Sequence, residues 1–112
     1  MPGEIVELTT RDEVIEYLKT HPVVIMKFTA TWCGPCKRST PLVNKLFNEM
    51  PSNVSMIVVD IDKARDISSA MKIKSVPTMH NFINGAPMDS VIGSKTDNIT
   101  SFFKKTMGRA SS

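Results

Sequence analysis

Residues 31–37 read TWCGPCK, and this stretch holds both cysteines of the 112-residue chain. Two cysteines separated by two residues fit a structural disulfide, half of a metal site or a redox centre. A structural disulfide here would close a very small loop and would constrain the unfolded chain little. Structural zinc needs four ligands, and the two histidines lie far from the cysteines without finger-like spacing. These arguments favour a redox centre.

The composition indicates a soluble globular protein. At 41% hydrophobic and 22% charged residues, we expect one domain over 1–112, with 109–112 as a frayed tail. No apolar run approaches the roughly 20 residues that cross a bilayer, and the N-terminal MPGEIVELTTRDE is too acidic for a signal peptide. We therefore expect a cytoplasmic protein without membrane contact. The net charge of +3 comes from scattered lysines and arginines, which does not favour nucleic-acid binding.

The hydrophobic pattern predicts strands and helices in the order βαβαβαββα. The run VVIMKF at 23–28 is apolar except for one lysine, which suits a central strand covered on both faces. Thr10 and Glu13 fit a capping box, and Ser94 fits the start of the last helix. The Asn-Gly pair at 84–85 predicts a hairpin. The other strands are expected at 5–8, 54–62, 76–83 and 89–93. The predicted buried stripes are Val14, Ile15 and Leu18 in the first helix and Ile99, Phe102 and Phe103 in the last. The two helices between them are marked by Leu42, Val43, Leu46, Phe47 and Met50, and by Ile67, Ala70 and Met71.

The local sequence around the cysteines suits redox chemistry. A strand is expected to end at Trp32 and a helix to begin near Cys33, so unpaired amides and the positive end of the helix dipole face the first sulfur. That environment favours the thiolate, which is the nucleophile. Gly34 and Pro35 allow a tight entry into the helix. Cys36 follows one turn later on the protein side, where it can attack a mixed disulfide.

The hexapeptide WCGPCK after an apolar strand resembles the active site of thioredoxins. The resemblance covers roughly residues 5 to 108. It implies the thioredoxin fold, an α/β fold with a central mixed sheet of four to five strands and helices on both faces. The further matching positions are Phe28, Ala30, Pro41, Asp60-Ile61-Asp62, Val76-Pro77-Thr78, Phe82, Asn84-Gly85 and Gly93.

The resemblance also implies residue roles and a reaction. Cys33 would be the nucleophile and Cys36 the resolving cysteine in dithiol–disulfide exchange with protein substrates. A thioredoxin reductase would recycle the pair with electrons from NADPH, and the protein would bind no cofactor or metal and act as a monomer. The expected substrate-binding residues are Trp32, Gly34, Pro35, Val76, Pro77 in the cis form, and Gly93.

Lys27 departs from the pattern that the resemblance implies. Thioredoxins usually carry a buried Asp at this position, and the Lys that often accompanies it is here Val58. Burial without a partner is costly for a lysine and lowers its pKa. Lys27 could be charged and paired with Asp60, could be a neutral proton acceptor for Cys36, or could extend to solvent without a catalytic role. Lys27 and Asp60 are therefore candidates for a proton relay or for tuning the thiol pKa.

Two other functions stay open from the sequence. The chain could be an isomerase or oxidant in an oxidising compartment, although Gly-Pro between the cysteines resembles a reductant. It could also be a partner-binding module, redox-controlled or not, because fold alone does not decide function.

Overall fold

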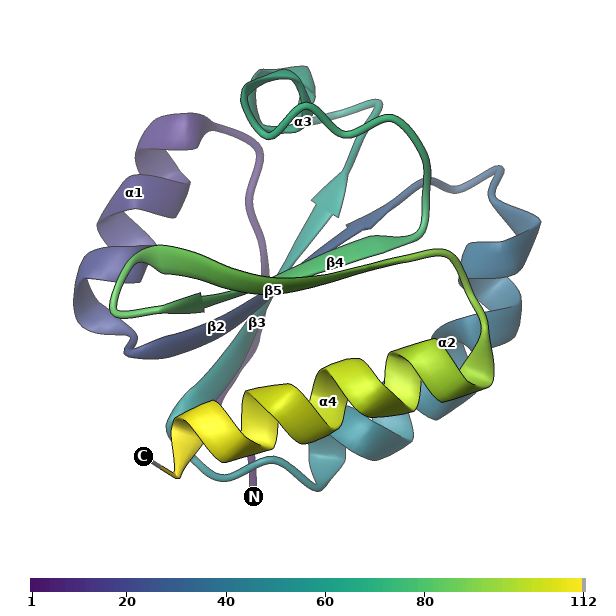
Figure 1. The fold of residues 1–112 in the computed structure, drawn as a ribbon. Helices are drawn as coiled ribbons and strands as arrows, with labels where there is room; N and C mark the ends of the chain where they lie inside the picture. The colour runs from purple at the N-terminus through teal and green to yellow at the C-terminus, as the bar shows by residue number, and fades with distance from the viewer. Residues whose placement is uncertain (112) are drawn as a thin grey trace.

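The computed structural model describes residues 1–111 and contains one sheet with helices on both faces (Figure 1). The order of elements is the predicted βαβαβαββα, so the α/β fold with helices on both faces is confirmed. The elements are β1 (Ile5–Glu7), α1 (Arg11–Thr20), β2 (Val23–Thr29), α2 (Gly34–Asn48), β3 (Val54–Asp60), α3 (Arg65–Ala70), β4 (Thr78–Ile83), β5 (Ala86–Ile92) and α4 (Thr96–Ala110).

The sheet has five strands in the order β1-β3-β2-β4-β5. The pairs β1–β3 and β3–β2 are parallel, while β2–β4 and β4–β5 are antiparallel. The apolar run that forms β2 lies in the middle of the sheet, as predicted. The turn between β4 and β5 contains Asn84 at φ 50° and Gly85 at φ 85°, the left-handed conformations that an Asn-Gly hairpin requires.

Side chains of β2 alternate between two hydrophobic layers because successive strand residues point to opposite faces. Ile25 packs in the layer under α2 and α4, and Met26 packs in the layer under α1 and α3. Figure 1 shows these two helix pairs on opposite sides of the sheet. Lys27 follows Ile25 on the α2 side, where its register neighbours are Val58 of β3 and Met79 of β4.

The helix predictions are wrong in burial at Ile15 and in helix length at Met50 and Met71. Ile15 keeps 49% of its surface exposed, because it lies about 100° around α1 from the buried Val14. Ile67 and Ala70 lie in the short α3 as predicted, and Ala70 is exposed as its last residue. Met50 is buried but lies beyond Asn48, where α2 ends, and Met71 likewise lies beyond Ala70, where α3 ends.

The helix ends follow the sequence signals in part. The capping box at α1 is confirmed, with Glu13 N donating to Thr10 Oγ1 at 3.2 Å and Thr10 N donating to Glu13 Oε1 at 3.0 Å. At α4 the expectation for Ser94 is wrong, since Lys95 occupies the N-cap and makes no side-chain cap bond. The tail predicted to fray from residue 109 is still helical to Ala110. Ser112 lies outside the described residues.

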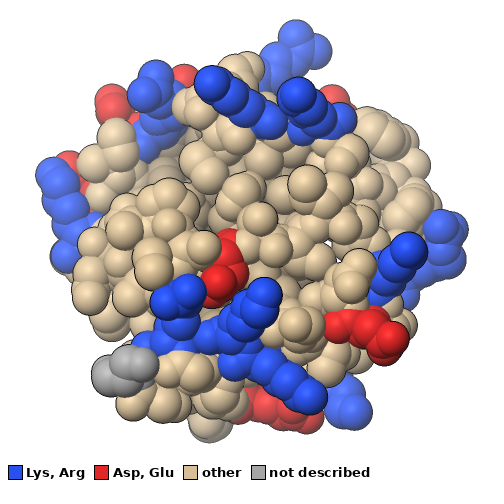
Figure 2. All heavy atoms as spheres, in the orientation of Figure 1, with Lys and Arg blue, Asp and Glu red and all other residues tan. Residues whose placement is uncertain are grey.

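Two further features are the distribution of surface charge and the hydropathy of the helices. On the face in Figure 2, Lys and Arg side chains stand in separate groups around a broad uncharged area, with acidic residues between them. Among residues 1–111, no helix is both long enough and apolar enough to cross a membrane.

Candidate active site

The two cysteines lie where the chain enters α2, and they form a disulfide. Cys33 is the N-cap of the helix, and Cys36 N donates a 3.1 Å hydrogen bond to Cys33 Sγ. This amide is one of those that a helix leaves unpaired at its first turn, so it and the helix dipole favour negative charge on Cys33. The approach differs from expectation in one detail, because β2 ends at Thr29 and a short turn carries Trp32.

Both cysteines lie just below the surface. The exposed fractions are 3% for Cys33 and 6% for Cys36. They pack with Ala30, and the half-buried Ile61 and Val76 complete the cluster. The inward place predicted for Cys36 is confirmed, but Cys33 is equally covered. A target disulfide therefore has to pass close to the residues around Cys33 before it can reach the Cys33 sulfur.

The loop before β4 borders the first sulfur. The Val76–Pro77 peptide bond is cis, as expected, and Val76 O lies 3.7 Å from Cys33 Sγ. Gly93 N donates a 2.9 Å hydrogen bond to Pro77 O, with Gly93 at φ 95°. Within residues 1–111, the Val76 N–H donates no hydrogen bond. The loop therefore presents a backbone donor and an acceptor beside the disulfide.

Trp32 projects from the turn before α2 with 66% of its surface exposed. Its Nε1 donates a 2.8 Å hydrogen bond to Asp62 Oδ2. Asp62 N in turn donates to Asp60 Oδ1 at 2.9 Å. Sequence reasoning did not assign a role to Asp62. The only signal was its place in the Asp-Ile-Asp segment that follows β3.

Gly34 and Pro35 form the first turn of α2 and are half-buried. A Cβ added at Gly34 would lie 3.1 Å from Arg38 Nη1. That contact is with the end of a flexible side chain. Gly34 and Pro35 lie at the start of α2 as expected, while the need for a tight entry and their contact with a substrate stay predictions.

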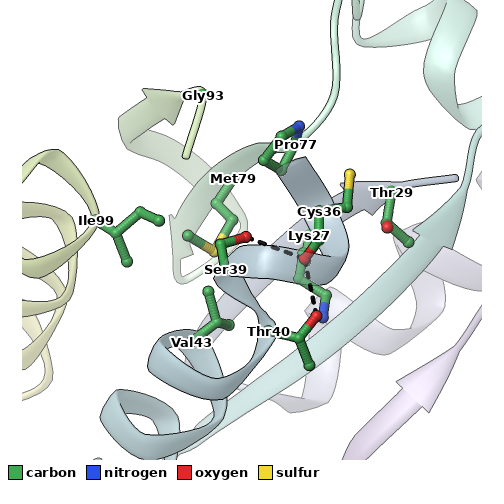
Figure 3. Close-up of a pocket in the computed structure, with 10 residues that line it drawn as sticks. All are labelled: Lys27, Thr29, Cys36, Ser39, Thr40, Val43, Pro77, Met79, Gly93 and Ile99. Atoms are coloured by element: carbon green, nitrogen blue, oxygen red, sulfur yellow. Dashed lines mark hydrogen bonds between the residues drawn. The ribbon is translucent and has the colours of Figure 1, made fainter. Parts of the chain in front are cut away.

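Lys27 reaches from β2 into a narrow cavity that Cys36 also lines (Figure 3). The lysine is half-buried, and this burial lowers its pKa from the ordinary value. No ion pair joins Lys27 to Asp60 or to any other acidic residue within 1–111. The charged and paired alternative is therefore not realised in this structure. Asp60 itself is buried and accepts the Asp62 amide instead.

The possible metal ligands His, Cys, Asp and Glu do not cluster in the described part of the chain. No group of three or more His, Cys, Asp or Glu residues within 1–111 could hold a metal ion. His80 is half-buried, its pKa is lowered by burial, and its ring stands edge-on to Phe28. It therefore occupies an ordinary packing position rather than a ligand position.

Comparisons with known proteins agree with this geometry. The thioredoxin family model matches residues 5–105. Thioredoxin-3 of Dictyostelium discoideum is 35% identical over 91 residues, which cover 81% of this chain and 86% of that protein. The crystal structure of Malassezia sympodialis thioredoxin superposes with a TM-score of 0.81 at 28% identity, covering 96% of this chain and 95% of that one. A bifunctional thioredoxin reductase/thioredoxin of Mycobacterium leprae is 29% identical over 93 residues, 83% of this chain and 20% of that protein.

Proposed function

Because the chain belongs to the thioredoxin family and is a thioredoxin-type disulfide reductase, we propose that Cys33 is its nucleophile and Cys36 its resolving cysteine. The observation that carries this assignment is the hydrogen bond from Cys36 N to Cys33 Sγ at the start of α2. A backbone N–H aimed at a sulfur stabilises the thiolate of that sulfur over the thiol. Cys33 is therefore the better nucleophile of the pair at neutral pH.

The reaction is a two-electron exchange in two steps. The Cys33 thiolate attacks one sulfur of the target disulfide, a mixed disulfide forms, and the first target sulfur leaves and takes a proton from solvent. Cys36 then loses its proton and attacks the Cys33 sulfur. The second target sulfur leaves, and the Cys33–Cys36 disulfide is formed. The target is reduced by the two electrons that the dithiol loses.

Substrate docking follows from the groups around the disulfide. We assign target contact to Trp32, Val76, Pro77 and Gly93, with the first turn of α2 at Gly34 and Pro35 beside them. The free Val76 N–H and the nearby carbonyl suit an extended target segment, which pairs through its backbone regardless of its side chains. The exposed indole of Trp32 gives the target an apolar contact.

Recycling and cellular context complete the proposal. Thioredoxins carry no prosthetic group, and the family works with thioredoxin reductase and disulfide substrates. We propose that such a reductase, using NADPH, returns the Cys33–Cys36 disulfide to the dithiol. The relative whose name joins a reductase to a thioredoxin supports this partner. We further propose a monomeric, single-domain protein that works in the cytoplasm without nucleic-acid or membrane partners.

The test measures NADPH consumption by the protein with a thioredoxin reductase and insulin, beside a Cys33→Ser variant. We expect turnover with the wild type and none with the variant. If dithiothreitol reduces the disulfide but the reductase does not, the proposed recycling partner is wrong. If Cys33→Ser keeps its activity, the assignment of the nucleophile is wrong.

A further inference from the structure

Lys27 and Cys36 share one narrow cavity between the sheet and α2 (Figure 3). The cavity has a volume of about 10 Å³, close to the space that one water molecule needs. Among residues 1–111, Lys27 and Cys36 are the two titratable residues that line it. The other lining residues are Thr29, Ser39, Thr40, Val43, Pro77, Met79, Gly93 and Ile99.

The groups packed around Lys27 leave its amine without a counter-charge. From α2, Ser39 Oγ and Thr40 Oγ1 donate their hydroxyl protons to Cys36 O at 3.1 Å and 2.8 Å. From β4 and α4 only apolar side chains face the cavity. The nearest acidic residue on β3 is Asp60. In the strand register Asp60 lies opposite Thr29, whereas Val58 lies opposite Lys27. No hydrogen bond or ion pair within residues 1–111 occupies the Lys27 amine.

The two cysteines differ in the help that the backbone gives them. Cys33 Sγ receives the Cys36 N–H, whereas no hydrogen bond within residues 1–111 is donated to Cys36 Sγ. A buried thiol without a donor keeps its proton, because burial disfavours the thiolate. Cys36 therefore needs a neighbouring group that takes its proton before it can attack.

We propose that, in the second half of disulfide exchange, the thiol proton of Cys36 passes across the shared cavity, through one water molecule, to the Lys27 amine. This inference rests on the proposed roles of Cys33 and Cys36. The neutral amine takes the proton, the Cys36 thiolate attacks the Cys33 sulfur, and the bond between Cys33 and the target breaks. The departing target thiolate takes the proton from the ammonium, or it takes one from solvent while the ammonium releases its proton to solvent. Either way the amine is neutral again. Burial, which lowers the pKa of Lys27, brings the neutral amine closer to neutral pH.

The test separates the two chemical steps by stopped-flow absorbance. Reduced protein reacts with dithiobis(nitrobenzoate), a disulfide whose released thiolate is yellow. The first equivalent of colour reports attack by Cys33, and the second reports attack by Cys36 on the mixed disulfide. Lys27→Met removes the amine at similar length, and Lys27→Arg keeps a positive charge that does not give up its proton. Lys45→Met is the matched control, because Lys45 is an exposed lysine of α2, the helix that carries Cys36.

We expect both Lys27 variants to slow the second phase by about 10-fold or more at pH 7. A positioned acid–base group typically accelerates a reaction by about 10²–10⁴-fold, and in the variants water can accept part of the proton flux instead. The first phase should stay within about 3-fold of the wild type, and Lys45→Met should change neither phase. In Lys27→Met the rate of the second phase should rise with pH about one unit later than in the wild type.

Two outcomes would overturn the inference about Lys27, and a third would overturn the proposed function. An unchanged second phase in Lys27→Met would make the lysine a bystander. A wild-type rate in Lys27→Arg would mean that positive charge suffices and that no proton passes to the amine. If a Lys27 variant does not fold, the pH profile of Lys27→Gln decides in its place. A missing first phase in the wild type would contradict the proposed function itself, since that phase depends on Cys33 alone.

Discussion

Trp32 Nε1 donates a 2.8 Å hydrogen bond to Asp62 Oδ2, which joins the turn before α2 to the segment after β3. Because Trp32 is the only tryptophan of the chain, its fluorescence reports this contact directly. We expect Asp62→Ala to change the tryptophan emission of the reduced protein. The KM for insulin should rise about 3- to 10-fold, which corresponds to the free energy of one exposed hydrogen bond. The kcat should change little.

Asp97→Ala is the control for this variant, because Asp97 is exposed on α4 and no hydrogen bond within residues 1–111 joins it to Trp32. It should leave the fluorescence and the KM as they are in the wild type. An Asp62→Ala protein with altered emission but an unchanged KM would mean that the indole orientation does not matter for docking.

Cys36→Ser should stop the exchange reaction at its midpoint. Cys33 keeps its place at the N-cap of α2 and its backbone N–H donor, so it still attacks a target disulfide. Without a second thiol the mixed disulfide cannot resolve. We expect one covalently attached target per protein by mass spectrometry, released by dithiothreitol. Cys33→Ser should show no adduct, and an adduct on Cys36 in that variant would contradict the proposed order of attack.

Gly93 tests the docking surface, because its Cβ position is empty. A methyl group there would meet nothing within 4 Å of the protein, and the residue has φ 95°. We expect Gly93→Ala to lower kcat/KM for insulin about 10-fold, roughly 1.4 kcal/mol of lost transition-state binding. The reaction with the small dithiobis(nitrobenzoate) should change much less, since a small disulfide does not pair with the loop.

Gly85→Ala is the matched control for Gly93→Ala. Gly85 also has a positive φ, at 85°, and its Cβ position is also empty, but it lies in the hairpin between β4 and β5. Each substitution should cost about 1–2 kcal/mol of stability from the left-handed backbone. Only the Gly93 variant should lose activity with insulin. An equal loss in both variants would assign the effect to stability rather than to docking.

The sequence predicted the order of elements because hydrophobic periodicity is a local property. The run at 23–28 was identified as a central strand because it is apolar on both faces, and β2 is central. Periodicity was less informative about helix surfaces. It assigned Ile15 to a buried stripe, whereas the width of a buried stripe depends on what packs against it. The N-cap at α4 failed for a related reason, since several residues near 94–97 satisfy the same local signal.

The active site was predictable to the extent that it is contiguous. Only two residues separate Cys33 from Cys36, so the chemistry of TWCGPCK could be predicted without the fold. The Trp32–Asp62 bond joins residues 30 positions apart, and no local pattern indicates it. The Lys27–Asp60 pair was suggested because both side chains share one face of the sheet. Asp60 instead accepts the amide two residues along the chain, a local bond that aspartate makes readily.

Thr106 should be important for stability, because it completes a buried polar network between β4 and α4. Asn81 Nδ2 donates to Thr106 Oγ1 at 2.9 Å, and both residues are 0% exposed. Thr106→Val keeps the shape but removes the acceptor, which should cost about 1–3 kcal/mol in urea unfolding. The control Thr100→Val, half-buried on the same helix, should cost less than about 0.5 kcal/mol. Equal losses would mean that the hydroxyl of Thr106 contributes nothing specific.

Asp89 should make stability depend on acid pH. Arg109 Nε donates to Asp89 Oδ2 at 2.8 Å and Nη2 donates to Oδ1 at 3.2 Å, and this pairing, with help from Asn81, lowers the pKa of Asp89 from 3.8 to about 2. Because the folded pKa lies below the unfolded one, the stabilisation is complete above about pH 4 and is lost as the pH falls towards 2.

Asp89→Asn should therefore lower the urea midpoint at pH 7 and converge with the wild type as the pH falls from 4 to about 2. The amide cannot carry the charge that Arg109 pairs with, so the deficit disappears when the wild-type carboxylate is protonated. Glu7→Gln on β1 is the control, because Glu7 is exposed and makes no ion pair within residues 1–111. Its urea midpoint should follow that of the wild type at every pH. A deficit in Asp89→Asn that stays constant down to pH 2 would assign the loss to packing rather than to the charge of Asp89.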